Sequence, residues 1–382
     1  MPKTLVSASP ADATTRPVRL SARDIAALTP PSRDRALDVA RAAAIVVVVV
    51  WHTVLSITHR NAAGAWTMPN PLDDIPLGWA LTWVLQVMPL FFVVGGAANW
   101  IAYERAQAKG RAGSTFVWSR CQRLLVPALR FLLVWAVADV VLLVAWPGYS
   151  SVTHWGVVLF VPLWFVAMYA LICATVPLGV ALERRVGAAS VVWVIVVATL
   201  FELVRRLYAP WLGVVSTPVV WFGCHQIGMS SARLSWWKST GYSFGVAVVG
   251  LVGLALTGVL GGYDPSLVAR PGGRSNLLPT TLPVLWAGLF HGGLLGTLTP
   301  WLRRVGQRRA VWVAAIVVNG SAMAVLCWHM TGRLVALLAW ERVCGPLAAE
   351  STSGWWAQRP LWLLASVVTT TAVVRAFRRW ER

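Results

Sequence analysis

The first long apolar segment contains two ionisable residues whose spacing could support catalysis. It reads Arg41, then ten residues that are all Ala, Ile, Val or Trp, then His52. Eleven helical steps advance the chain by about 16 Å and return to within about 20° of the starting direction, so both residues share one face. A guanidinium can bind phosphate through paired hydrogen bonds, and a desolvated imidazole can take a proton from an attacking hydroxyl. The alternative is an arginine that reaches the membrane surface and a histidine bonded to a neighbouring helix.

A second basic cluster opens the third apolar segment. Arg120 and Arg123 precede it or stand at its start, and Arg130 lies within it. We expect the three side chains to line one helical face and to form a basic stripe that suits a polyphosphate ligand. The alternative is that they are ordinary basic residues of a cytoplasmic loop. Asp38, three residues before Arg41, is expected to pair with it.

Long apolar segments must position these residues. The chain of 382 residues is 57% hydrophobic and 12% charged, against about 25% charged in an average soluble domain. Segments of about 20 apolar residues recur, each long enough to cross a bilayer. We therefore predict an all-α, polytopic membrane bundle of about ten transmembrane helices. The predicted spans are 38–57, 78–102, 121–146, 157–182, 188–207, 212–230, 239–261, 281–300, 310–334 and 359–378.

The basic residues predict how the bundle is oriented. On this assignment 23 of the 33 lysines and arginines fall on the side that holds both termini, and eight fall on the other. The excess places both termini in the cytoplasm. It also accounts for the net charge of +19 without nucleic acid, because no basic domain is present. We expect residues 1–36 to form a disordered cytoplasmic tail and residues 37–382 to form the transmembrane domain.

Cysteine and histidine patterns give no sign of a metal site. The five cysteines include no CxxC pair, so neither a zinc site nor a disulfide framework is predicted. Of the other histidines, His291 is expected to make a packing hydrogen bond. His225, at a predicted span end, either lines a ligand mouth or caps a helix, and His329 is equally compatible with a packing role and a site role.

Five segments follow one another along the chain: Arg35 with Leu37 to Arg41 and His52, Phe91 to Gly96, Arg120 with Arg123 and Pro127, Leu163 to Phe165, and Cys327 to His329. In this order they resemble the acyltransferase-3 family of membrane acyltransferases. The resemblance covers about residues 33–335. It departs from the family at Gly95, where the family usually has Ser.

The resemblance implies transfer of an acyl group, commonly acetyl, from cytoplasmic acyl-CoA to a hydroxyl of an envelope carbohydrate or lipid. His52 would be the essential base and Arg41 its partner, while the basic stripe would bind the donor. The protein would then lie in a bacterial inner membrane and need no metal. The long loops 262–280 and 335–358 are candidates for shaping the acceptor site. The rival hypothesis is a multi-pass transporter or flippase for a polar or anionic solute, although the chain shows no internal repeat.

Overall fold

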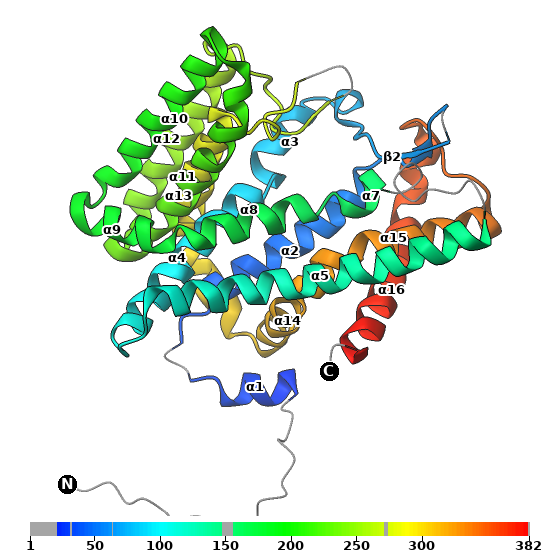
Figure 1. The fold of residues 1–382 in the computed structure, drawn as a ribbon, viewed down its shortest axis with the longest axis horizontal. Coiled ribbons are helices and arrows are strands. Elements are labelled where there is room, and N and C mark those ends of the chain that lie inside the picture. Colours follow the sequence, from blue (N-terminus) through cyan, green and yellow to red (C-terminus); the bar gives the residue numbers. More distant parts are fainter. Residues whose placement is uncertain (1–20, 31–32, 63, 147–155, 271–273, 381–382) are drawn as a thin grey trace, which may run out of the picture.

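A computed structural model describes residues 21–30, 33–62, 64–146, 156–270 and 274–380. The described chain is almost wholly helical (Figure 1). A single two-stranded hairpin, β1 (His59–Arg60) with β2 (Trp66–Thr67), occurs in these residues. The helices are α1 (Ala22–Leu28), α2 (Ala36–Val54), α3 (Gly78–Leu85), α4 (Met88–Gln107), α5 (Gly113–Ala145), α7 (Gly156–Phe160), α8 (Leu163–Ala174), α9 (Val176–Val186), α10 (Ala189–Leu207), α11 (Gly213–Leu234), α12 (Thr240–Val259), α13 (Leu282–Gln307), α14 (Arg309–Gly320), α15 (Ala322–Cys344) and α16 (Ser353–Trp380).

The helices confirm a polytopic membrane protein. Seven described helices are long and apolar enough to cross a bilayer, or eight if the bent unit of α7 to α9 is one span. The predicted fifth and sixth spans fall on α10 and α11, which are more polar: α10 carries Glu202, Arg205 and Arg206 near its end. Each of the ten predicted segments thus lies on a helix or on a group of broken helices.

The last two predicted spans, 310–334 and 359–378, differ from the helices in their ends. The chain breaks at Ser321, and α15 runs to Cys344 rather than ending near residue 334. Arg333 and Arg359, which stand at the ends of these predicted spans, lie inside helices, because α15 continues to Cys344 and α16 begins at Ser353. An arginine is a strong signal for the end of a span, but the apolar run that follows Arg333 continues the helix.

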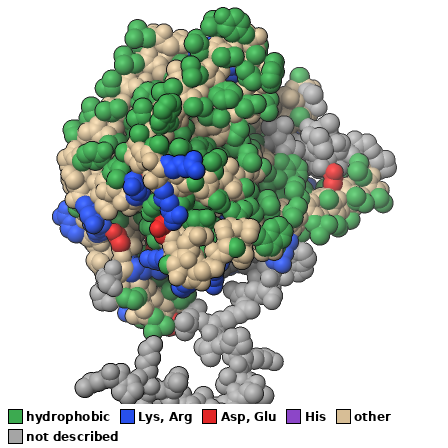
Figure 2. Space-filling view, turned by 60° about the vertical axis from the view of Figure 1, so that its left-hand side comes forward, with side chains coloured by type: hydrophobic (Ala, Val, Ile, Leu, Met, Phe, Trp, Pro, Cys, Tyr) green, Lys and Arg blue, Asp and Glu red, His purple; other side chains and the backbone are tan. Residues whose placement is uncertain are grey.

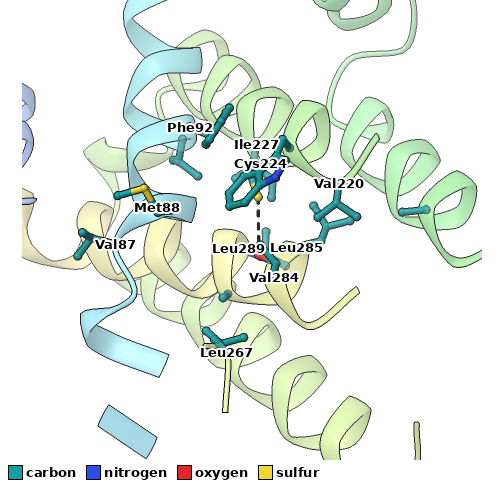
Figure 3. Packing of buried hydrophobic residues seen from close by; sticks show 14 of the residues in the cluster. Val87, Met88, Phe92, Val220, Cys224, Ile227, Leu267, Val284, Leu285 and Leu289 are labelled. Atoms are coloured by element: carbon teal, nitrogen blue, oxygen red, sulfur yellow. Dashed lines mark hydrogen bonds between the residues drawn. The ribbon is translucent and has the colours of Figure 1, made fainter. Parts of the chain in front are cut away.

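The core lies where α4, α11 and α13 meet. Figure 3 shows Phe92 of α4, Ile227 of α11 and Leu285 of α13 packed together. A Cβ at Gly96 of α4 would overlap the carbonyl oxygen of His225, and one at Gly228 of α11 would overlap the carbonyl oxygen of Val93. Glycine is therefore required where these two backbones approach, as is common between membrane helices.

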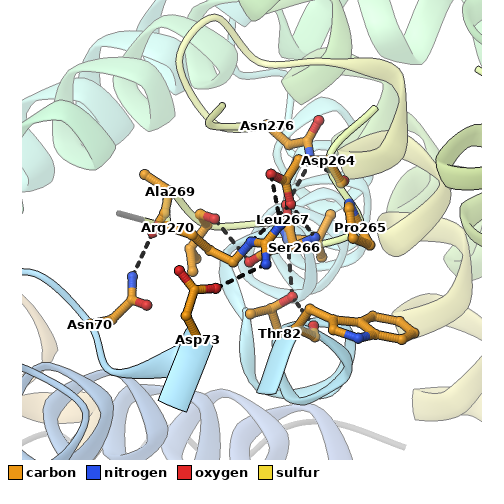
Figure 4. Close-up of polar contacts among 12 residues, drawn as sticks. Asn70, Asp73, Thr82, Asp264, Pro265, Ser266, Leu267, Ala269, Arg270 and Asn276 are labelled. Atoms are coloured by element: carbon orange, nitrogen blue, oxygen red, sulfur yellow. Dashed lines mark hydrogen bonds and ion pairs between the residues drawn. The ribbon is translucent and has the colours of Figure 1, made fainter. Parts of the chain in front are cut away.

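Residues 264–270 and 274–280, which precede α13, form a cap that is bonded to α3 and to the segment before it, and Figure 4 shows these polar contacts. Arg270 bridges Asp264 and Asp73 at 3.2 and 2.9 Å, and the hydrogen bonds to Asp264 raise the pKa of Arg270. The backbone N–H of Leu267 donates to the Thr82 hydroxyl on α3 at 3.0 Å. The cap is thus tied to α3 and to the segment before it by several independent bonds.

The opposite end carries α1 and the end of α16 on the same side of the bundle (Figure 1). Part of the predicted disordered tail is helical: α1 begins with a capping box at Ser21 and packs against α14, where the Trp312 indole donates to the Thr29 hydroxyl at 3.2 Å. Residues 1–20 lie outside the described residues. Figure 2 shows lysine and arginine side chains gathered toward one end of a mainly hydrophobic face.

Candidate active site

Two imidazoles from different helices meet inside the bundle. Nδ1 of His52, on α2, lies 3.0 Å from Nε2 of His329, on α15, with the ring planes within 10° of each other. His329 is 2% exposed. Its Nδ1 lies 2.9 Å from the carbonyl oxygen of Val325 and 3.0 Å from that of Leu326, in the preceding helical turn.

These contacts fix the protonation pattern of the neutral pair. Carbonyl oxygens accept hydrogen bonds, so Nδ1 of His329 carries a hydrogen and donates it. In a neutral ring Nε2 of His329 is then an acceptor, and the hydrogen of the shared bond belongs to Nδ1 of His52. Nε2 of His52 is left with its lone pair. That is the form in which a histidine can act as a general base.

Each imidazole of the pair lines one of two adjoining cavities in the described structure. The first, of about 210 Å³, is lined by His329 and reaches toward the N-terminal end of α2. The second, of about 170 Å³, is lined by His52 and reaches the cap, through Val268 and Leu277. Both cavities share the side chains of Val48, Met88, Phe165 and Leu326 as walls. We call them the His329 cavity and the His52 cavity.

The His329 cavity combines an apolar wall with polar groups. Arg41 of α2, Arg120 of α5, Asn99 of α4 and Tyr169 of α8 line it. The guanidinium of Arg120 also lies over the Phe116 ring, 5.2 Å from its centroid. The volume is below the roughly 300–1,000 Å³ of pockets that enclose a drug-sized ligand. This cavity therefore suits the narrow end of a long ligand whose charged part stays at the arginines.

Arg41 and His52 lie along the cavity side of α2, as their spacing predicts, since Arg41, Val48 and His52 all line one cavity or the other. The prediction that Asp38 pairs with Arg41 is wrong. Asp38 pairs instead with Arg33, at 2.7 Å, because the segment before α2 brings that guanidinium to the carboxylate. Arg41 forms no ion pair with a carboxylate that the structure describes, so its charge is available to a ligand.

The three arginines of α5 do not share one environment. Arg120 lines the His329 cavity, whereas Arg123 and Arg130 are exposed and line neither of the two cavities. Ten helical steps turn the chain about 80° away from the starting direction, so Arg130 points off the face of Arg120. Little of α5 is buried, and most of it forms the outer surface of the bundle. A donor-binding role for Arg123 and Arg130 stays a prediction.

Tyr169 explains the glycine at position 95. A Cβ at Gly95 would overlap the Tyr169 hydroxyl, which leaves no room for a serine side chain. Tyr169 lines the His329 cavity. Its phenol therefore occupies the space beside α4 where a serine would otherwise present its hydroxyl, so a hydroxyl group is still present on this side.

Broken helices line the His52 cavity, and sequence reasoning missed them. The break between α3 and α4 contributes Leu85 to Met88, and the break before α8 contributes Val161 and Pro162. Irregular backbone at membrane depth is tolerated where it is buried in protein or lines a cavity. Two signals could have revealed these breaks: Gln86 and Pro162 each interrupt an apolar run.

The remaining buried histidines lie apart from this pair. Nε2 of His291 lies 2.8 Å from the Trp83 carbonyl oxygen, which confirms the expected packing hydrogen bond. His225 is not at a helix end but in the middle of α11, where the Asn99 amide donates to its Nε2 at 3.1 Å. No group of three or more metal-ligand side chains occurs among the described residues.

Comparison with known proteins gives one match. The family model described as an acyltransferase domain, acyltransferase-3, matches residues 34–378. Neither the curated proteins nor the solved structures include a significant match to the chain. The matched range contains both histidines of the pair and every residue that lines the two cavities. Since the family model covers nearly the whole chain, this protein belongs to the acyltransferase-3 family of acyltransferases.

Proposed function

We propose that this protein transfers an acyl group, expected to be acetyl, from a cytoplasmic acyl-CoA to a hydroxyl of an envelope carbohydrate or lipid. The observation that carries the proposal is the imidazole pair, which lines two adjoining cavities and leaves the lone pair of His52 Nε2 available to accept a proton. Arginines line one of the two cavities, and Val268 and Leu277 of the cap line the other.

The donor occupies the His329 cavity. The phosphates of the CoA bind Arg41 and Arg120 at its mouth, because guanidinium groups form paired hydrogen bonds with phosphate oxygens. Arg123 and Arg130 add positive charge on the outer surface of the same helix. The acyl-pantetheine arm extends past Asn99 and Tyr169 to the imidazole pair. A volume of about 210 Å³ suits this arm and leaves the nucleotide outside.

The acceptor hydroxyl enters the His52 cavity from the side of the cap. Nε2 of His52 takes the hydroxyl proton as the oxygen attacks the thioester carbon, and the carbon–sulfur bond then breaks. The departing CoA thiolate takes that proton back from the imidazolium, so the pair returns to its starting form. His329 is a positioning residue, because its Nε2 holds the hydrogen of His52 on Nδ1. We propose that this reaction uses no metal and that it takes place in a bacterial inner membrane.

The test uses purified protein in detergent. We expect micromolar binding of acetyl-CoA and slow loss of its thioester, and we expect the loss to require His52. His59→Gln is the matched control, because His59 lies in the hairpin and lines neither of the two cavities. Turnover that persists in a folded His52→Ala variant contradicts the assignment of the base. A folded wild-type protein that binds no acyl-CoA, yet takes up solute in proteoliposomes, supports the transporter hypothesis instead.

A further inference from the structure

A buried arginine lies one helical turn beyond the imidazole pair. Arg333 of α15 is 3% exposed, and its guanidinium contacts the Thr58 hydroxyl and the Met68 sulfur. Both contacts are with neutral groups. Its Nε has no hydrogen-bond partner. The cation is therefore removed from solvent without an opposing charge.

A second buried arginine lies nearby on α16. Arg359 is 4% exposed, and its guanidinium lies over the ring of Trp355, 4.1 Å from the centroid. Its Nε donates to the Trp355 carbonyl oxygen, while Nη1 and Nη2 have no partner. Trp362 links the two arginines, because it lies 6.0 Å below Arg359 and also lines a small cavity with Arg333.

Other arginines of this chain show the usual arrangement. Arg205 bonds Glu202 within α10, and Arg270 bridges two carboxylates of the cap. Neither Arg333 nor Arg359 forms an ion pair with a carboxylate in the described part of the chain. A buried charge without a partner costs several kcal/mol, and an ionisable residue inside a membrane bundle is a functional candidate by default. Two such residues on either side of Trp362, with three guanidinium nitrogens that have no hydrogen-bond partner, call for an anion.

Arg333 and Arg359 lie near the end of α2 that carries His52, the residue that lines the proposed acceptor cavity. Arg333 follows His329 by four residues, which places it about 6 Å along α15 on the same face. Thr58 follows the end of α2 that carries His52, and the Trp362 indole donates to the Thr53 carbonyl oxygen at 3.0 Å. A single sugar ring could bridge from the arginines to the pair.

We propose that Arg333 and Arg359 bind an oxyanion group, carboxylate or phosphate, of the acceptor, so that the acceptor is an anionic carbohydrate or lipid. This inference rests on the proposed acyl transfer. Paired N–H donors of a guanidinium match the geometry of both oxyanions. The anion would hold the acceptor with a hydroxyl directed toward His52.

An anion can reach Arg333 only if a neighbouring segment moves. The cavity beside Arg333 has a volume of about 10 Å³, about enough for one water molecule. Trp66 of the β1–β2 hairpin forms part of its wall, and the exposed Arg60 lies over that ring, 4.7 Å from the centroid. Movement of this hairpin would open the subsite, and Arg60 would attract the anion to its entrance.

The test measures thermal unfolding by tryptophan fluorescence in nanodiscs of neutral phosphatidylcholine. The soluble probes are methyl glucuronide and glucose 1-phosphate, with methyl glucoside as the neutral match. A second arm adds phosphatidylglycerol to the disc, to distinguish a lipid headgroup from a soluble sugar. We expect a saturable rise in Tm with at least one anionic probe and none with methyl glucoside.

The variants are Arg333→Met and Arg359→Met, with Arg342→Met as the control, since Arg342 is exposed on the same helix. We expect half-saturation to weaken by about tenfold or more in the first two, since a hydrogen bond to a charged group contributes about 1.5–3 kcal/mol. The control should bind as the wild type does. Without anion, Arg359→Met should be at least as stable as the wild type, because an unpaired buried charge is removed.

A Tm that no anionic probe raises overturns the inference, as does an equal rise in the wild type and Arg359→Met. If the methionine variants do not fold, Arg359→Lys decides the question: it keeps the charge, so undiminished anion affinity contradicts the paired hydrogen bonds. The assay contains no acyl-CoA. Anion binding without His52-dependent thioester loss therefore contradicts the proposed function alone, and thioester loss without anion binding contradicts this inference alone.

Discussion

Replacing His329 by leucine should slow acyl transfer without preventing donor binding. His329 accepts the hydrogen bond from Nδ1 of His52 across 3.0 Å, and leucine offers no acceptor. A buried N–H that loses its partner costs about 1–3 kcal/mol. If that whole cost is expressed in the transition state, kcat falls by about 5- to 150-fold. The loss arises because His52 can then place its hydrogen on Nε2, the atom that must accept the proton.

The assay is steady-state thioester cleavage of acetyl-CoA, with Tm as the check of folding. His329→Gln supplies an amide oxygen as a substitute acceptor, so we expect it to recover part of the lost kcat. KM for acetyl-CoA should change much less than kcat in both variants, because the phosphates bind elsewhere. The reasoning is refuted if His329→Leu turns over at the wild-type rate while His52→Ala is inactive. Equal losses in the leucine and glutamine variants refute it as well.

The remaining predictions concern the donor cavity and one surface pair. Arg41→Gln should raise KM for acetyl-CoA by about 10- to 150-fold, since hydrogen bonds to a charged group contribute about 1.5–3 kcal/mol; an unchanged KM contradicts phosphate binding there. Gly95→Ser should lower stability by about 1–3 kcal/mol through overlap with Tyr169, and the loss should shrink in a Tyr169→Phe background when Tm is measured. Burial raises the pKa of Asp34, but hydrogen bonds from Arg303 and a backbone N–H outweigh it and leave the pKa below 3.8. This half-exposed pair contributes at most about 1 kcal/mol to the free energy of unfolding. The contribution is fully present above pH 3.8 and is lost as the pH falls through the pKa that Asp34 has in the folded protein. A Tm difference between wild type and Asp34→Asn that is the same at every pH contradicts this prediction.

Sequence periodicity predicted the cavity face of α2 because helical geometry alone determines it. Arg41 and His52 both lie on the cavity side, since eleven helical steps slightly exceed three full turns. The same rule, applied to α5, would have separated Arg130 from Arg120 by about 80°. Which apolar segments form helices was equally predictable, since the length of an apolar run is a direct requirement of the bilayer.

The partner of His52 could not be predicted, because it comes from a helix 277 residues further along the chain. The sequence shows His329 as an isolated polar residue, equally suited to packing. Tertiary approach also decides that Tyr169 fills the space beside Gly95. The burial of Arg333 was not predictable for a different reason: rules for span ends treat an arginine as a boundary, whereas a buried arginine can lie within a helix.

Transfer of label from radioactive acetyl-CoA by the reconstituted protein tests the central claim most directly. The comparison is between wild type and His52→Ala, each first shown to bind acetyl-CoA with equal affinity. The account predicts that label leaves CoA in the wild type and stays on CoA in the variant. Equal release of label by the two proteins, or no release by a wild type that binds the donor, would contradict it.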